Sequence, residues 1–103
     1  MFGLTKRDLQ LIVDVIKAYP QIDEAIIFGS RALNTYKKGS DIDIALKGRE
    51  IELTVSTISG ILNDESSLPY FCDVLDYDLI DSEDLRNHID RVGRKIYKNM
   101  TSK

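Results

Sequence analysis

Two apolar runs joined by a glycine turn and a polar loop constrain this chain more than any other feature. Residues 26–46 read IIFGSRALNTYKKGSDIDIAL, and the second run carries Asp41 and Asp43. This run alternates apolar and polar side chains, as expected of a β-strand with one buried face. The alternation places the two carboxylates on the same face, roughly 6–7 Å apart along the strand. Two carboxylates on one face are suitable ligands for a hard cation.

Hydrophobic periodicity predicts a helix and a strand before this feature. Thr5 and Asp8 resemble a capping box, and the helix that they begin ends at Tyr19-Pro20, because proline disfavours helical geometry in the residue before it. Residues 24–28 form the next strand, in which Ala25–Phe28 is continuously apolar. A strand of this kind is covered on both faces, so we expect it to be central in its sheet.

The rest of the chain continues the alternation of strands and helices. We predict a strand over Asp41–Leu46, a helix from Ile51 to Leu62, a strand over Tyr70–Tyr77, and a last helix with a buried stripe. The residues of that stripe are Leu85, Ile89, Val92 and Ile96. We expect Lys98–Lys103 to fray. The predicted fold class is α/β (α+β), a mixed sheet of about three to four strands with helices packed on it.

Composition limits what such a chain can do. With 103 residues, 43% hydrophobic and 30% charged, we expect a single globular domain over residues 1–103. A formal net charge of −3 argues against an extended nucleic-acid-binding surface. The sequence shows no signal peptide and no apolar run of membrane-spanning length, and its one cysteine, Cys72, cannot build a disulfide framework. We therefore expect a cytoplasmic protein that does not enter membranes.

The Gly29-Ser30 turn supplies the second half of a candidate site. Gly29 ends a strand and Ser30 begins a short helix, whose first N–H groups are suited to bind an anion such as a phosphate. Arg31 has two interpretations, a residue that steadies those phosphates or an exposed arginine at the start of a helix. The expected ligand is a metal-bound nucleotide, because Mg²⁺ shares its coordination between carboxylates and phosphates.

A third carboxylate on the neighbouring strand would complete a two-metal phosphoryl-transfer site and help to deprotonate an attacking hydroxyl. Asp73 and Asp76 both lie in the predicted strand over residues 70–77, on opposite faces, so only one of them can join the first two aspartates. We favour Asp73. For His88, the only histidine, we expect a structural or interface role, and for Cys72 that of a small buried hydrophobic residue.

These residues together resemble a known family. Gly29-Ser30, ten intervening residues, the Asp41-x-Asp43 pair and a later strand with an aspartate are similar to the polymerase-beta nucleotidyltransferase superfamily. The resemblance is to its minimal nucleotidyltransferase (MNT) branch and covers nearly the whole chain. It implies the palm fold of that superfamily, with phosphates held at Gly29 and Ser30, two divalent ions at Asp41 and Asp43, and Asp73 acting toward the acceptor hydroxyl. Asp73 also completes the predicted metal site.

The resemblance also implies a function and a partner. MNT proteins of this size are typically encoded beside a helical HEPN-type toxin and neutralise it by transferring AMP onto it. The expected activity is a Mg²⁺-dependent transfer of a nucleoside monophosphate (NMP) to a hydroxyl on that protein. The expected NMP is AMP, and its donor is ATP. The alternative is a non-catalytic antitoxin that masks its partner by contact. A homo- or hetero-oligomer is expected. The residues do not specify the base of the nucleotide, the acceptor group or the oligomeric state.

Overall fold

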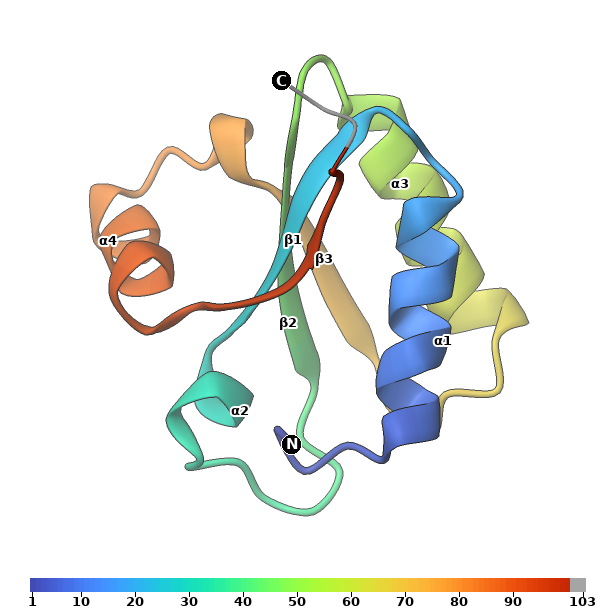
Figure 1. Cartoon of the computed structure of the whole chain (residues 1–103). Helices are drawn as coiled ribbons and strands as arrows, with labels where there is room; N and C mark the ends of the chain where they lie inside the picture. Colours follow the sequence, from blue (N-terminus) through green and yellow to red (C-terminus); the bar gives the residue numbers. More distant parts are fainter. Residues whose placement is uncertain (101–103) are drawn as a thin grey trace.

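The computed structural model describes residues 1–100, which form a sheet with helices on both faces (Figure 1). The helices are α1 (Lys6–Lys17), α2 (Ser30–Leu33), α3 (Glu52–Gly60) and α4 (Glu83–Val92). The strands are β1 (Ile22–Phe28), β2 (Ile42–Gly48), β3 (Cys72–Asp76) and β4 (Arg94–Lys98). A π-helical turn over Ile61–Glu65 extends α3, and a short 3₁₀ turn over Tyr77–Leu79 follows β3. Within residues 1–100, no helix is long and apolar enough to cross a membrane.

The sheet is mixed, as predicted. Its strand order is β3-β2-β1-β4; β1 runs antiparallel to both β2 and β4, whereas β2 and β3 are parallel. The prediction that β1 is central is confirmed, because this strand lies between β2 and β4. The parallel pair places the beginnings of β2 and β3 at the same edge of the sheet. That edge also receives the end of β1, since β1 is antiparallel to β2.

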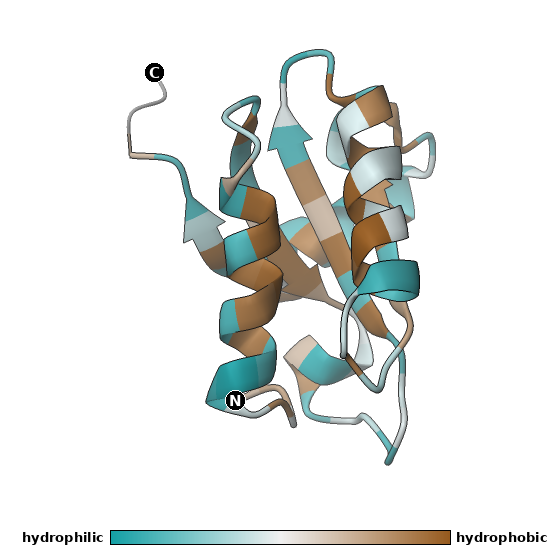
Figure 2. Ribbon diagram, turned by 90° about the vertical axis from the view of Figure 1, so that its right-hand side faces the viewer, coloured by the Kyte–Doolittle hydropathy of each residue, from teal (hydrophilic) through white to brown (hydrophobic). Residues whose placement is uncertain are grey.

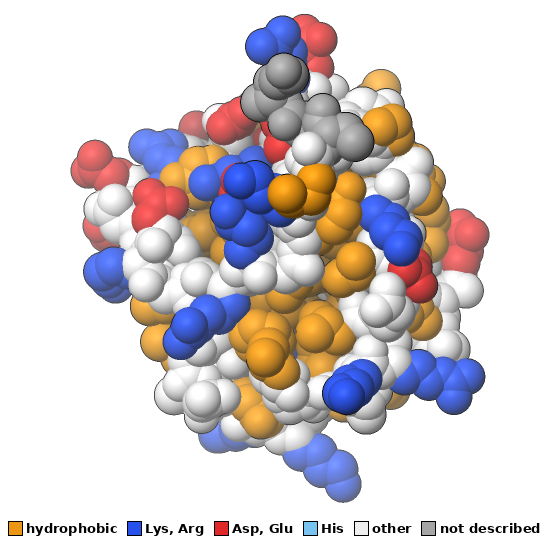
Figure 3. Space-filling model, viewed as in Figure 1, with side chains coloured by type: hydrophobic (Ala, Val, Ile, Leu, Met, Phe, Trp, Pro, Cys, Tyr) orange, Lys and Arg blue, Asp and Glu red, His pale blue; other side chains and the backbone are white. Residues whose placement is uncertain are grey.

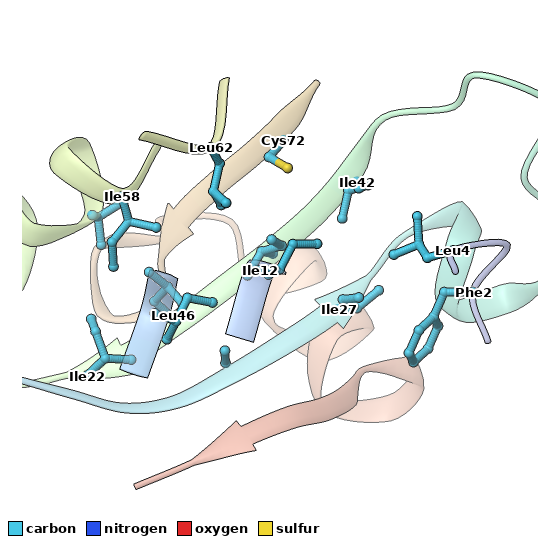
Figure 4. Close-up of a cluster of buried hydrophobic side chains, with 14 of the residues drawn as sticks. Phe2, Leu4, Ile12, Ile22, Ile27, Ile42, Leu46, Ile58, Leu62 and Cys72 are labelled. Carbon is cyan, nitrogen blue, oxygen red and sulfur yellow. The ribbon is translucent and has the colours of Figure 1, made fainter. Parts of the chain in front are cut away.

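One face of the sheet carries a large apolar core under α1 and α3 (Figures 2 and 4). Alternate residues of β2 point into it, namely Ile42, Ile44 and Leu46, each of which is fully buried. From α1, Ile12 and Ile16 pack against the same core. The predicted capping box begins α1, with the Asp8 amide donating to Thr5 Oγ1 at 3.0 Å and the Thr5 amide donating to Asp8 Oδ2 at 3.4 Å.

The opposite face carries a smaller apolar cluster under α4. Its buried residues are Ile26, Phe28, Ala45, Ile80 and Ile89. Gly93 brings the end of α4 close to β1, because a Cβ at this glycine would collide with the Ile89 carbonyl and with the Ile26 side chain. The helix is therefore held tightly against the strand whose end carries the Gly29-Ser30 turn.

The predicted extent of the last helix is wrong. The helix ends at Val92, and residues 94–98, including Ile96, form β4 on the free edge of β1. Gly93 has φ −61° and ψ 147°, which is extended backbone, and hydrogen bonds to β1 then replace those that a continuing helix would have made. The fraying predicted from Lys98 is also wrong at its beginning, since the Asn99 amide donates to the Asp23 carbonyl at 2.8 Å. Residues 101–103 lie outside the described residues.

Candidate active site

The Gly29-Ser30 turn lies where β1 ends and α2 begins. Gly29 has φ +74° and ψ −154°, a conformation that only glycine adopts without strain. Its carbonyl accepts the Leu33 amide at 3.1 Å, which starts α2. A Cβ at Gly29 would also meet the Asp43 carboxylate, which would have to move, but the backbone angles are the stricter requirement for glycine here. The turn and Asp43 are therefore in direct contact.

Two of the candidate carboxylates are neighbours across parallel strands. Asp43 of β2 is the register partner of Asp73 of β3, and adjacent strands lie about 4.8 Å apart. Partners in a parallel ladder point their side chains to the same face. Asp41 immediately precedes β2 and shares that face by alternation, although the strand begins one residue later than predicted. The structure thus brings Asp41, Asp43 and Asp73 together beside the turn, at the end of the sheet where β2 and β3 begin. We call this part of the surface the carboxylate edge.

Asp76 occupies the opposite side of β3. Its register partner is Leu46, which points into the core under α1 and α3. The Asp76 side chain accepts the Asp78 amide at 3.1 Å and so caps the 3₁₀ turn that ends the strand. Of the two aspartates that the sequence left open, Asp73 is therefore the one that lies beside Asp43.

The carboxylates repel one another at this edge. Burial raises the pKa of the Asp43 carboxyl above its usual range, and the charges of Asp73 and then Asp41 raise it further, while His88 lowers it. Asp41 and Asp73 are exposed, whereas Asp43 is half-buried. A bound cation would relieve this repulsion, which is the electrostatic signature of a site that accepts positive charge.

Arg31 has a different position from either sequence interpretation. It is buried, with 2% exposure, and its guanidinium donates to the Phe2 carbonyl at 2.8 Å and to the Ser40 carbonyl at 2.6 and 3.2 Å. Two aromatic rings lie against it, those of Tyr36 and Tyr70. Arg31 is therefore not an exposed arginine, and these bonds commit its guanidinium to backbone carbonyls rather than to the turn. It fixes the residue immediately before Asp41.

Asn63 performs a similar task for the third aspartate. Its side-chain amide donates to the Cys72 carbonyl at 2.8 Å, and its carbonyl accepts the Cys72 amide at 2.7 Å. The π-helical turn after α3 carries this asparagine. The two hydrogen bonds fix the start of β3 one residue before Asp73. Sequence reasoning missed both anchors, since the predicted helix ends at Leu62, just before Asn63, and the partner of Asn63 lies nine residues away.

The remaining single-residue predictions can be placed as well. Cys72 is fully buried, and burial raises the pKa of its thiol to about 11, as expected of a small apolar residue rather than a nucleophile. His88 on α4 accepts a hydrogen bond from the Gly29 amide at its Nε2 atom, at 3.1 Å. The sequence predicted a structural or interface role for this histidine, but gave no reason to place it at the turn.

The donor set fits a cation that also takes ligands from a nucleotide. Among residues 1–100, no three His, Cys, Asp or Glu side chains are grouped closely enough to hold a metal ion by themselves. Mg²⁺ commonly binds to one or two carboxylates and completes its shell with phosphate oxygens and water. Asp41 and Asp43 supply carboxylates of this kind next to a turn suited to phosphates. The protein would thus supply only part of the metal's ligands, and the nucleotide and water would supply the rest.

A large hollow on the described surface lies elsewhere. It measures about 1050 Å³ and lies between α1, α2 and β4, where Figure 3 shows apolar side chains with Lys and Arg around them. Its lining contains none of Asp41, Asp43 and Asp73. This hollow therefore does not mark the candidate site, which the convergence of the three carboxylates identifies instead.

Comparison with known proteins agrees with this geometry. Residues 10–102 match the family "Polymerase beta, Nucleotidyltransferase". The chain belongs to this nucleotidyltransferase family. The matched residues include the turn, the two aspartates of the β2 segment and Asp73. No curated protein sequence matches the chain.

Solved structures of toxin–antitoxin complexes share the fold. A chain of a toxin–antitoxin complex with AMP-PNP has a TM-score of 0.70 and 20% identity, over 95% of this chain and 77% of that chain. A chain of the MntA–HepT complex has a TM-score of 0.69 and 18% identity, over 94% and 75%. In a tri-AMPylated HEPN toxin from Shewanella oneidensis with its MNT antitoxin, a chain has a TM-score of 0.69 and 18% identity, over 95% and 76%. These similarities confirm the predicted nucleotidyltransferase fold.

Proposed function

We propose that this chain is a Mg²⁺-dependent nucleotidyltransferase that moves AMP from ATP to a hydroxyl of a helical HEPN-type protein, and thereby acts as an antitoxin. The observation that carries the proposal is the in-register pairing of Asp43 with Asp73 beside the Gly29-Ser30 turn. This arrangement joins a phosphate-binding turn, a metal-binding pair and a third carboxylate. Such a combination suits nucleotidyl transfer, whereas a purely structural role places no demand on carboxylates that repel one another.

The proposed reaction assigns a task to each carboxylate. The acceptor hydroxyl attacks the α-phosphorus of ATP, a new P–O bond forms, and the bond to the β-phosphate breaks with release of pyrophosphate. Asp73 takes the proton of the hydroxyl, since its side chain is exposed and β3, which carries it, is the outer strand of the β2–β3 pair. Gly29 and Ser30 bind the β- and γ-phosphates. The chain's role is mainly to position these groups, as is general in phosphoryl transfer.

Asp41 and Asp43 would hold the metal ions, two in number. When bound, Mg²⁺ supplies positive charge that offsets the charge on the phosphate oxygens. The raised pKa of Asp43 supports this assignment, because burial and the charges of Asp73 and Asp41 outweigh the opposing effect of His88 on this carboxyl. Exposure of Asp41 leaves room for phosphate and water as further ligands. As the register partner of Asp43, Asp73 is also assigned a share of one metal ion in this proposal, besides the proton.

The proposed acceptor follows from the relatives and from the exposed carboxylates. One of the compared complexes contains a tri-AMPylated HEPN toxin with its MNT antitoxin, and another is a toxin–antitoxin with AMP-PNP. None of the three carboxylates lines the hollow between α1, α2 and β4, and Asp41 and Asp73 are exposed. A partner protein that covers the carboxylate edge would supply both the hydroxyl and the missing wall of the site. An oligomer with such a partner is therefore part of the proposal.

Label transfer tests the proposal. The chain is incubated with Mg²⁺, with ATP labelled at the α-phosphate, and with a helical HEPN-type protein as the acceptor. We expect label on that protein, and none when the label is at the γ-phosphate. Asp43→Asn should reduce transfer by more than about 100-fold, since loss of even an outer partner of a metal ligand costs about 10–100-fold.

Asp76→Asn is the matched control. It makes the same chemical change on β3, but on the side of Leu46, and the amide can still cap the 3₁₀ turn. Transfer should stay near the wild-type rate. Wild-type transfer by a folded Asp43→Asn variant would refute the proposal. Neutralisation of the partner without label and without Mg²⁺ would instead establish the non-catalytic antitoxin.

A further inference from the structure

We propose that His88 is a positioning residue that sets the conformation of the Gly29-Ser30 turn through a hydrogen bond from the Gly29 amide. The bond joins Gly29 N to His88 Nε2 at 3.1 Å and connects residues 59 positions apart. It links α4 to the end of β1, at the point where the candidate phosphate site begins. The inference deepens the proposed function and rests on it where nucleotide binding is concerned.

The direction of the hydrogen bond fixes the state of the imidazole. Nε2 accepts a proton from a backbone amide, so it carries no proton of its own, and the neutral ring holds its proton on Nδ1. The amide could not donate to Nε2 if both ring nitrogens were protonated. His88 therefore acts here as a neutral acceptor, which is not the form that would bind phosphate by charge.

The turn needs an external acceptor at this amide. Phe28 and Asp43 are the last register partners of β1 and β2, so Gly29 lies beyond their ladder. Its φ of +74° turns the chain away from the strand direction. Because its N–H group leaves the sheet and belongs to no helix, the acceptor comes from another element. His88 supplies that acceptor and so selects the orientation of the peptide between Phe28 and Gly29.

The helix that carries His88 is held firmly in place. The imidazole meets the Phe28 ring edge-on, with centroids 6.1 Å apart and planes at 78°. Its neighbour Ile89 is buried, and the close approach at Gly93 fixes the end of α4 against β1. An acceptor on a rigid element holds its partner more accurately than one on a loop. The geometry of α4 is thus transmitted to the turn.

Two consequences follow at the site. Ser30, which the proposed function assigns to the phosphates, is placed by the peptide that His88 orients. Asp43 is placed as well, because its carboxylate lies against the Gly29 Cα with no room for a Cβ. A turn released from His88 could move toward or away from this carboxylate. His88 therefore positions a phosphate ligand and a metal ligand together, without touching the nucleotide.

Two substitutions separate this role from packing. His88→Gln keeps an acceptor near the position of Nε2 but removes the aromatic ring. His88→Phe keeps the ring against Phe28 but removes the acceptor. If His88 only packs, the phenylalanine variant should resemble the wild type and the glutamine variant should not. A positioning role predicts the reverse.

The first measurement concerns the free protein and needs no activity. In ¹⁵N-labelled wild type, NMR should show a scalar coupling across the hydrogen bond between the Gly29 amide nitrogen and His88 Nε2, with the ring proton on Nδ1. The amide resonances of Gly29 and Ser30 should stay near their wild-type positions in the glutamine variant and move in the phenylalanine variant. Absence of the coupling with the ring proton on Nε2, or equal shifts in both variants, would overturn the inference.

The second measurement is binding of AMP-PNP with Mg²⁺ by calorimetry. The phenylalanine variant should bind about fivefold to tenfold more weakly, as expected for the loss of one hydrogen bond, and the glutamine variant within about twofold of wild type. Equal loss in both variants would contradict the positioning role. If wild type binds no AMP-PNP but shows the NMR coupling, the proposed function fails and the role of His88 in the turn stands.

Discussion

The two faces of strand β2 differ in function: one builds the larger core, and the other carries the candidate site. Toward α1 and α3 the strand points Ile42, Ile44 and Leu46, all fully buried in the larger core. Toward α4 the same strand points Ala45 and the half-buried Asp43, and Asp41 precedes it on that side. The first face supplies burial, whereas the second holds like charges together. A stable core on one face lets the other keep a group of carboxylates that does not favour folding.

The largest effect should come from the core face. Leu46→Ala removes a fully buried side chain at the centre of the larger core and should lower the free energy of unfolding by about 3–5 kcal/mol. Chemical denaturation measures this loss. Since the substitution lies on the far face of β2, the fraction that remains folded should bind Mg²⁺ and AMP-PNP normally. A loss below about 1 kcal/mol would mean that this face does not dominate stability.

A substitution of Arg31 should affect both the stability of the fold and the candidate site. Arg31→Ala should lower the free energy of unfolding by about 2–4 kcal/mol, because it leaves the Phe2 and Ser40 carbonyls without their donor in a buried place. Nucleotide binding should weaken too, since Ser40 precedes Asp41. Denaturation and calorimetry measure the two effects. Arg31→Lys is the control, and its ammonium should restore part of the stability.

An Arg31→Ala variant of normal stability but reduced binding would instead mean that the guanidinium acts on the nucleotide. That outcome would restore the phosphate-binding role predicted from the sequence. Arg31 would then be a nucleotide-binding residue rather than a residue that holds the backbone around the site. The burial of the side chain, at 2% exposure, argues for the role in holding the backbone.

Local patterns predicted those parts of the molecule that local chemistry determines. Period-two alternation gave the two faces of β2, and the continuous apolar run gave β1 its central place. Parity alone showed that only one of Asp73 and Asp76 could join the first two aspartates, and the register with Asp43 selects Asp73, the residue favoured from the sequence. In each of these cases, neighbouring residues carry the information. The resemblance to the nucleotidyltransferase superfamily was likewise readable, because its motif lies within a short stretch.

Long-range partners explain what the sequence could not predict. Ile96 fits the period of the last helix, but the open edge of β1 and the extended Gly93 made it part of β4. The anchors of the site are equally remote. Arg31 contacts Phe2, and His88 contacts Gly29 across 59 positions. No local pattern marks such a contact, although a glycine followed by an Arg-Lys-Ile-Tyr-Lys segment could have indicated a helix end and a strand.

The smallest predicted effect is an increase in stability caused by a substitution at the candidate site. Asp43→Asn removes one of three like charges and should raise the free energy of unfolding at neutral pH, on the order of 1 kcal/mol. The pKa of Asp43 is raised in the folded protein, so the folded state holds the proton more tightly than the unfolded state. The wild type therefore loses stability relative to the variant as pH rises from the ordinary carboxyl pKa, 3.8, through the folded value.

Denaturation of both proteins across this pH range checks the sign. The difference between them should vanish at low pH, where Asp43 is protonated in both the folded and the unfolded wild type, and reach its full size above the folded pKa. A variant less stable than wild type at neutral pH would mean that the Asp43 carboxylate is stabilised by a partner rather than strained by its neighbours.

Thermal unfolding of wild type and Asp43→Asn, with and without Mg²⁺ and AMP-PNP, tests the central claim most directly. Without ligand, the variant should melt at the higher temperature, because the site face keeps its carboxylates together at the expense of stability. With ligand at about 100 times its dissociation constant, the wild type should gain about 2.7 kcal/mol and melt above the variant. This reversal is the predicted result. A wild type that gains no more than the variant would show that the carboxylates do not form a metal–nucleotide site.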